Sequence, residues 1–265
     1  MASIGIGLGI GLEAGNQSST TPPPTTPLTD ATFNQAITDI LAQDPNGDYD
    51  LVPYGKIQDW DVSQVTDFTN AFRDKTSFNG DISAWNTSSA TTMNRMFQGC
   101  SSFNQPIGSW NLSGVTNISQ MFLDNVVFNQ DLNGWDTSNV TLMTQMFSNA
   151  QAFNKNLNGW DTSQVTNMYQ MFTNAQAFNG NVSTWNVSNV VSMGNMFQNC
   201  FAFNQDISSW NTSTVTNMFA MFKNATSFNQ NLSSWSVSNV TGCSQFSSGA
   251  TSWTLPKPNF TNCTP

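Results

Sequence analysis

The stretch Trp160-Asp-Thr-Ser-Gln-Val-Thr-Asn-Met-Tyr-Gln-Met-Phe172 recurs with small changes along most of the chain. The tryptophans that open the copies lie 25 residues apart, without insertion or deletion: Trp60, Trp85, Trp110, Trp135, Trp160, Trp185, Trp210 and Trp235. We call each copy a unit, number the units 1 to 8 and count the tryptophan as position 0. One unit cannot bury its own apolar face, so neighbouring units must stack. The sequence therefore predicts a repeat solenoid of about eight coils.

Several positions hold one residue type in almost every unit. Position 3 is always Ser, position 6 is Thr except for Val191, and position 12 is Phe in every full unit. Position 8 is mostly Met, a side chain that fills irregular gaps and contacts aromatic rings favourably. We expect the Trp, Met and Phe columns to form the core. The alternative is that they line a groove that faces a cofactor or a membrane.

The pattern inside one unit predicts one short helix and one short strand. Met168, Met171 and Phe172 are spaced i, i+3 and i+4, which places them on one side of a helical turn. We therefore expect a short helix from position 7 to about position 14, with Thr166 as its N-cap. We expect residues 179–185 to be extended and to pair in parallel with the same segment of the neighbouring units.

One asparagine per unit follows a phenylalanine, at position 19. These residues are Asn79, Asn104, Asn129, Asn154, Asn179, Asn204 and Asn229. An amide side chain carries both donors and an acceptor, so a column in register can pair the backbone groups of its own and the next unit. We interpret the column as a structural ladder. A polar binding row is the alternative.

Composition excludes several classes of function. The chain of 265 residues has 7 Lys+Arg, 16 Asp+Glu and no His, for a net charge of −9. Without His there is no imidazole catalysis and no His metal site. The basic footprint that nucleic acid requires is missing, and no apolar run is long enough to span a bilayer. Uniform repeats bring no unlike groups together, so we expect no enzyme, no catalytic residue and no cofactor.

The N-terminal residues have a separate character. Glycine alternates with aliphatic residues in segment 1–15, and we interpret this segment as a strand that docks into another subunit or a partner. The docking residues are Ile4, Ile6, Leu8, Ile10 and Leu12. A signal peptide and a disordered tail are the alternatives. Residues 16–28, rich in Ser, Thr and Pro, predict an extended spacer.

Both ends of the repeat region 60–247 are expected to carry caps. Residues 29–59 predict a helical N-terminal cap, because apolar residues in 31–43 follow helical spacing after an N-cap at Asp30 or Thr29. The apolar positions are Phe33, Ala36, Ile37, Ile40 and Leu41. Residues 248–265 are expected to cover the last unit with Trp253, Leu255 and Phe260.

Cysteines and acidic residues suggest two further features near these ends. Cys243 and Cys263 are placed to pair across the C-terminal cap, and the sequence leaves open whether they do. Cys100 and Cys200 share one column four units apart, about 19 Å, and are too distant to pair. A weak candidate calcium loop holds alternating oxygen ligands at Asp44, Asn46, Asp48 and Asp50. A Pro-Asn-Gly turn explains the same loop.

The stretch that begins at Trp160, together with Ala177-Phe-Asn, resembles the repeat of the BspA-like surface-protein family. The similar variant has the pattern W-D-x-S-x-V-T-x-M-x-x-M-F and occurs in Mycoplasma-type lipoproteins. The segment Tyr54–Ser63 also resembles the usual start of that repeat, and the likeness covers about residues 31–247. The resemblance implies a leucine-rich-repeat-like solenoid with one short strand and one short helix per coil. It implies roles in surface adhesion or interaction and no catalytic residues.

Two binding functions follow from these features. The first is a rigid solenoid displayed through residues 1–15 on a surface assembly, most plausibly as a virion fibre or decoration protein used for attachment. Its partners are subunits of the assembly, further copies of the chain, and a host or neighbouring surface. The second is a secreted or cell-surface bacterial adhesin of the BspA-like type. Both place the protein on the outside, and the sequence names neither ligand nor copy number.

Overall fold

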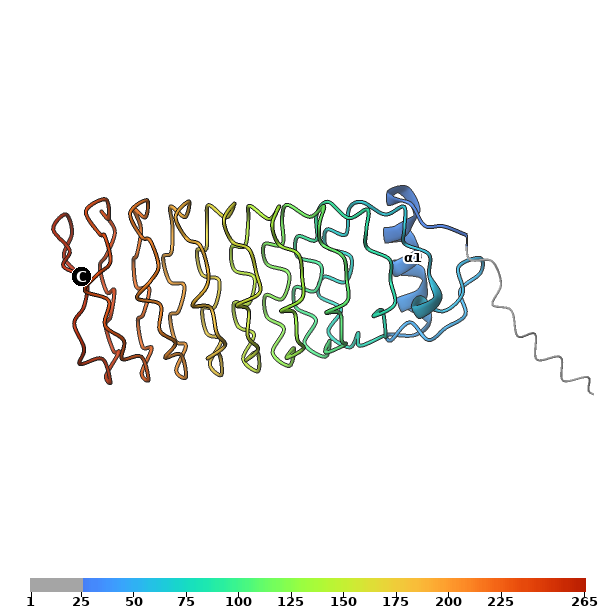
Figure 1. Cartoon of the computed structure of the whole chain (residues 1–265). Helices are drawn as coiled ribbons and strands as arrows, with labels where there is room; N and C mark the ends of the chain where they lie inside the picture. Colours follow the sequence, from blue (N-terminus) through green and yellow to red (C-terminus); the bar gives the residue numbers. More distant parts are fainter. Residues whose placement is uncertain (1–25) are drawn as a thin grey trace, which may run out of the picture.

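The computed structural model describes residues 26–265. Helix α1 lies at one end of an elongated molecule and the C-terminus lies at the other (Figure 1). Between them the units form successive turns of chain that lie side by side along the long axis. The expected docking segment 1–15 and most of the spacer 16–28 lie outside the described residues.

Helix α1 (Asp30–Gln43) forms where apolar spacing predicts a helix over 31–43. Thr29 is the N-cap and forms a capping box with Thr32. The buried face of α1 covers the first unit, where the ring of Phe33 lies 5.1 Å from the ring of Phe68 and 5.8 Å from that of Trp85. The helix thus covers apolar surface that would otherwise be open at this end.

Asp30, the first residue of α1, also supplies hydrogen-bond acceptors for backbone N–H groups of unit 1. One oxygen of the Asp30 carboxylate accepts hydrogen bonds from the N–H groups of Thr66 and Asp67, at 2.7 and 3.1 Å. The other accepts the Thr66 hydroxyl at 2.6 Å. Burial raises the pKa of Asp30, but these hydrogen bonds outweigh burial and the pKa is lowered. In later units the position-6 N–H donates to the preceding unit, so Asp30 replaces a missing neighbour.

Parallel pairing between units occurs at position 7 rather than in the segment expected from the sequence. One isolated bridge joins each unit to the next through Asp67, Thr92, Asn117, Leu142, Asn167, Ser192, Asn217 and Gly242. At position 6 the N–H of Thr116 donates to the carbonyl of Thr91 at 2.9 Å, and the same bond recurs along the column. The expectation that residues 179–185 form the paired strand is therefore wrong.

The short helix expected in each unit does not form. Within the part of the chain that the structure describes, the helices are α1 and the 3-10 helix η1 (Ile57–Asp59), which both precede Trp60. Residues 169–174 are a run of turns. Thr166 is therefore also not an N-cap, because no helix begins after it.

Two left-handed residues in each unit explain the missing helix. Positions 10 and 14 have a positive φ, which is 56° at Gln170 and 60° at Asn174 in unit 5. The same holds at position 14 in every unit: Asp74, Gly99, Asp124, Asn149, Asn174, Asn199, Asn224 and Gly249. A left-handed residue breaks the α-helical hydrogen-bond pattern and is typical of turns. The spacing of Met168, Met171 and Phe172 therefore arises from consecutive turns.

Alternate N–H groups of this segment point in two directions. In unit 5 the N–H groups of residues 168, 170, 172 and 174 donate to carbonyl oxygens of residues 192, 194, 196 and 198 in the next unit, at 2.8 to 3.0 Å. Between them, the N–H groups of Met171 and Thr173 close turns onto Met168 and Gln170, both at 3.2 Å. Each unit thus satisfies half of this backbone itself and depends on its neighbour for the rest.

The core consists of aromatic columns that run along the molecule. Within unit 4 the rings of Phe147 and Phe153 stack at 4.0 Å, and Phe147 stacks on Phe172 of the next unit at 5.5 Å. The rings of Trp160 and Trp185 lie 6.2 Å apart at an interplanar angle of 6°. Identical side chains therefore contact one another across every unit boundary, which fixes the register of the stack.

The C-terminal residues close the other end. Trp253 packs edge-on against Phe228 at 4.7 Å, and Phe260 packs against Phe246 at 4.9 Å. Leu255, which the sequence places in this cover, remains 43% exposed. It contributes its backbone instead, because its N–H donates to the Asn229 side chain at 3.0 Å.

Substitution of Asn174 tests the left-handed position 14. We expect Asn174→Ala to lower the free energy of unfolding by about 1–2 kcal/mol, because alanine pays the left-handed penalty and loses the side-chain bonds to Asn149 and Asn199. Asn174→Gly loses the same side chain but adopts positive φ freely, as Gly99 and Gly249 do in this column. It should therefore lower the free energy of unfolding less than Asn174→Ala does. Denaturant unfolding measures both, and equal losses would contradict the account.

Candidate functional site

The asparagines at position 19 form a continuous hydrogen-bonded ladder. The Oδ1 atom of each accepts the backbone N–H of the asparagine 25 residues later, at 2.8 to 2.9 Å over the six steps from Asn79 to Asn229. The side chains are half-buried or exposed, so the ladder runs along the surface. This geometry fits a structural role, since each acceptor is already engaged by the protein itself.

The ladder extends into both caps. At the N-terminal end, Oδ1 of Asn46 accepts the N–H of Asn79 at 3.2 Å. At the other end, Oδ1 of Asn229 accepts the N–H groups of Thr254 and Leu255, at 2.9 and 3.0 Å. The caps therefore continue the bonding pattern of the units that they cover.

The weak candidate calcium loop uses its oxygens in other ways. Asn46 begins the ladder, and the two carboxylate oxygens of Asp44 accept the N–H groups of Asn46 and Asp48, both at 3.0 Å. This is the hydrogen bonding of an Asp-initiated turn. The arrangement favours the turn over the calcium site that Asp44, Asn46, Asp48 and Asp50 suggest.

The tryptophan column is buried in all eight units, between 2% and 4% exposed. Each indole N–H from Trp85 onward donates to the carbonyl of the residue 28 positions earlier, at 2.8 to 3.2 Å. That acceptor is the position-22 aliphatic residue, or Ile57 in the case of Trp85. The indole thus ties the core to the backbone of the preceding unit, and no tryptophan faces a groove.

Sequence reasoning missed two further side-chain ladders. At position 14, Nδ2 of Asn174 donates to Oδ1 of Asn149 at 2.6 Å, and neighbouring units repeat this bond. At position 10, Nε2 of Gln145 donates to Oε1 of Gln170 at 2.8 Å. The restriction of position 14 to Asp, Asn and Gly was the available signal, because these residues tolerate a left-handed backbone.

The outward residues beside position 22 bind their own backbone. The side-chain oxygens of Asn181 and Asp206 accept the N–H groups of Ser183 and Ser208, at 2.9 and 3.0 Å. The Asp131 carboxylate accepts the N–H of Asn133 at 2.9 Å. Hydrogen bonds from the Ser208 backbone and hydroxyl lower the pKa of Asp206. These side chains stabilise turns of their own unit.

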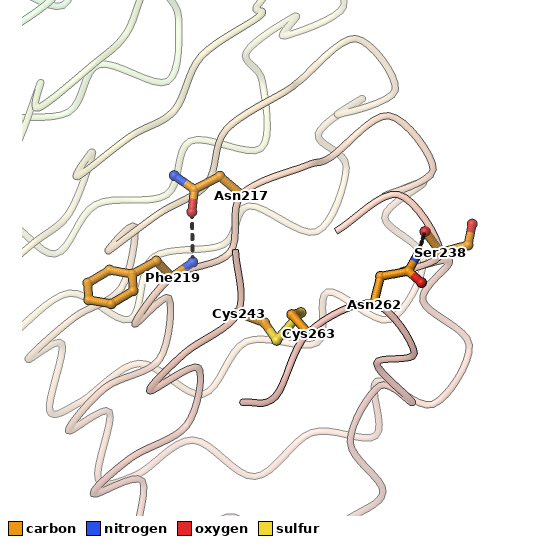
Figure 2. The surroundings of a disulfide bond; sticks show 6 residues. All are labelled: Asn217, Phe219, Ser238, Cys243, Asn262 and Cys263. Atoms are coloured by element: carbon orange, nitrogen blue, oxygen red, sulfur yellow. Dashed lines mark hydrogen bonds between the residues drawn. A yellow bond between two sulfur atoms is a disulfide. The ribbon is translucent and has the colours of Figure 1, made fainter. Parts of the chain in front are cut away.

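The cysteines fall into two kinds. Cys243 and Cys263 form a disulfide that ties the C-terminal segment to unit 8, with Asn262 hydrogen-bonded to the carbonyl of Ser238 beside it (Figure 2). Cys100 and Cys200 are free, fully buried, and donate to backbone carbonyls of Phe72 and Phe172. Burial raises the pKa of Cys100 to about 12 and also raises that of Cys200.

Exposed apolar side chains gather at positions 6, 7 and 9 of four successive units. They are Leu142, Tyr169, Val191 and Phe219, which are 37% to 47% exposed. In other units these positions hold mainly Thr, Ser, Asn, Asp or Gly. Exposed side chains therefore vary more from unit to unit here than in the ladder columns.

The described residues hold no group of three or more His, Cys, Asp or Glu side chains that could bind a metal ion. None of the helices in residues 26–265 is long and apolar enough to cross a membrane. A family model described as Mycoplasma protein of unknown function, DUF285, matches residues 50–160 and 143–259. No curated protein and no solved structure matches the chain.

Asn154 tests the ladder. We expect Asn154→Ala to lower the free energy of unfolding by about 1–2 kcal/mol, because the N–H of Asn179 loses its acceptor. Asn154→Asp keeps an oxygen at that position and is expected to lose less than half as much. Chemical denaturation compares the two variants with the parent. Equal destabilisation by both, or none by either, would show that the acceptor oxygen does not matter.

The cysteines predict a pattern of thiol reactivity. Because the free thiols are buried and their pKa values are raised, we expect no reaction of the folded protein with dithionitrobenzoate at pH 8. In denaturant without reductant, two thiols per chain should react, since Cys243 and Cys263 are joined. Rapid labelling of the folded protein, or four reactive thiols in denaturant, would contradict this arrangement.

Proposed function

Because the chain belongs to the family described as Mycoplasma protein of unknown function, DUF285, we propose that it is a non-enzymatic surface protein that acts by binding. BspA-like surface proteins carry this type of repeat, which supports a place on the outside of a cell or particle. We propose that the stacked units form a leucine-rich-repeat-like solenoid in which turns and single bridges take the place of the expected helix and strand.

The observation that carries this proposal is the uniform stack of units, in which backbone groups of one unit form hydrogen bonds with those of the next. Its backbone is hydrogen-bonded from unit to unit, its aromatic core is continuous, and both ends are covered. Such a body is stiff and presents the same outward side chains at each step. Weak contacts repeated along a rod and among many copies give strong attachment through avidity.

The disulfide supports a place outside the cytosol. Disulfides persist in secreted proteins and on cell and virion surfaces, whereas cytosolic thiols are kept reduced. The Cys243–Cys263 bond ties the C-terminal segment to unit 8. The C-terminus lies at the end of the molecule remote from α1 (Figure 1).

The finer assignment is a virion fibre or decoration protein used for attachment, anchored through residues 1–15. A cell-surface or secreted bacterial adhesin of the BspA-like type is the alternative. Both use the same rod and differ in what carries it.

Fractionation of the source culture tests the proposal. Extracellular particles are separated on a density gradient, intact cells are treated with protease, and an antibody against residues 60–247 detects the protein. Migration with particles supports the fibre, and loss on treatment of intact cells supports the adhesin. Protein found only in the protease-resistant cytosolic fraction would contradict a surface role of either kind.

A further inference from the structure

Position 9 departs from the repeat in three successive units. Its residues are Thr69, Asn94, Ser119, Thr144, Tyr169, Gly194, Phe219 and Ser244. The two aromatic rings flank a glycine and are 37% and 41% exposed. They lie two units apart, about 10 Å at the usual spacing of paired strands. We call Tyr169, Gly194 and Phe219 the notch.

The floor of the notch is a glycine because its neighbours lean over it. A Cβ atom at residue 194 would lie 2.8 Å from Nδ2 of Asn217 and 3.2 Å from Cδ2 of Tyr169. An amide therefore borders the glycine on one side and the edge of an aromatic ring on the other. A side chain at position 194 would therefore push the amide or the ring aside.

The amide beside the notch is held in place and keeps bonding capacity. Oδ1 of Asn217 accepts the N–H of Phe219 at 3.0 Å (Figure 2). Its Nδ2 donates to the hydroxyl of Ser192 at 3.1 Å. An amide has two donor hydrogens and two acceptor lone pairs, so one of each remains. In Figure 2 the ring of Phe219 extends away from the disulfide. The notch thus combines exposed rings with an oriented polar group.

The chain segments that surround the notch contain no charged residue. Positions 3 to 11 of units 3 to 8 contain no Asp, Glu, Lys or Arg; these are residues 113–121, 138–146, 163–171, 188–196, 213–221 and 238–246. The nearest charged residue along the chain is Lys223, whose Nζ donates to Gln245 at 2.6 Å. The net charge of −9 is carried elsewhere on the protein. This distribution favours a neutral ligand and disfavours a polyanion.

We infer that the notch binds a neutral glycan. The C–H faces of sugar rings stack on exposed aromatic rings, while hydroxyl groups bond to fixed amides such as that of Asn217. Two unit steps, about 10 Å, match the length of about two sugar residues of an extended chain. A protein hot spot would instead place Trp, Tyr or Arg anchors in one contiguous patch, and this strip has no Arg. The inference rests on the proposed binding function and names its ligand class.

A glycan array tests the inference with the full-length protein. We expect binding to neutral glycans that persists in 0.5 M NaCl, because charge does not contribute. Tyr169→Thr and Phe219→Ser, which restore side chains of the same column, should each weaken binding about tenfold. Gly194→Ser should weaken it too, because the added side chain would displace the Asn217 amide or the Tyr169 ring. Leu142→Asn, an exposed residue of the same face outside the notch, is the matched control and should bind like the parent.

Thermal unfolding of each variant shows whether the variant is folded, so that a loss of glycan binding is not mistaken for a loss of folding. Absence of binding to every neutral glycan on the array would overturn the inference, as would binding restricted to sulfated or sialylated glycans. Equal binding by the parent and the notch variants would also overturn it. None of these results affects the surface location, which the fractionation experiment decides separately.

Discussion

Hydrogen bonds between neighbouring units are the interaction on which the rest of the structure depends. The units contain no helix, and their pairing is limited to single bridges, so about half of the N–H groups at positions 8 to 14 must find acceptors in the next unit. A backbone that bends to make this possible needs left-handed residues at positions 10 and 14. The side chains there then pair along the stack, so backbone conformation and side-chain ladders support each other.

Exact repetition follows from this constraint. A single inserted residue would move Asn79, Trp85 and every later partner out of register, because each ladder and ring column needs the same side chain 25 residues away. At the N-terminal end of the stack, residues of the cap take the place of the missing preceding unit. Asp30 supplies the acceptor that a preceding unit would give, and Asn46 supplies the first step of the asparagine ladder. Surface positions such as 9 are free of the constraint, which is why Tyr169, Gly194 and Phe219 can differ.

The sequence predicts the stacking period, the buried columns and α1 well. The regular spacing of tryptophans and other apolar residues indicates directly which side chains are buried. It misassigns the local structure of each unit. Met168, Met171 and Phe172 have helical spacing, yet turns give the same burial, and the deciding information lies in residues that tolerate positive φ, such as Asn174. The asparagine ladder is anticipated from its chemistry, whereas its reach into Asn46 is not. A prediction based on the regular positions does not find the notch, because the notch consists of residues that depart from the repeat.

Amide hydrogen exchange tests most directly whether bonds between units hold the protein together. The account predicts that the N–H groups of Asn154 and Asn179 exchange only on global unfolding, although their side chains are exposed, because each donates to the preceding ladder residue. The N–H groups of Gln170 and Phe172 should be protected to the same degree through their acceptors in unit 6. Exchange of these four amides at the rate of an unstructured peptide, while the aromatic core stays protected, would contradict the account.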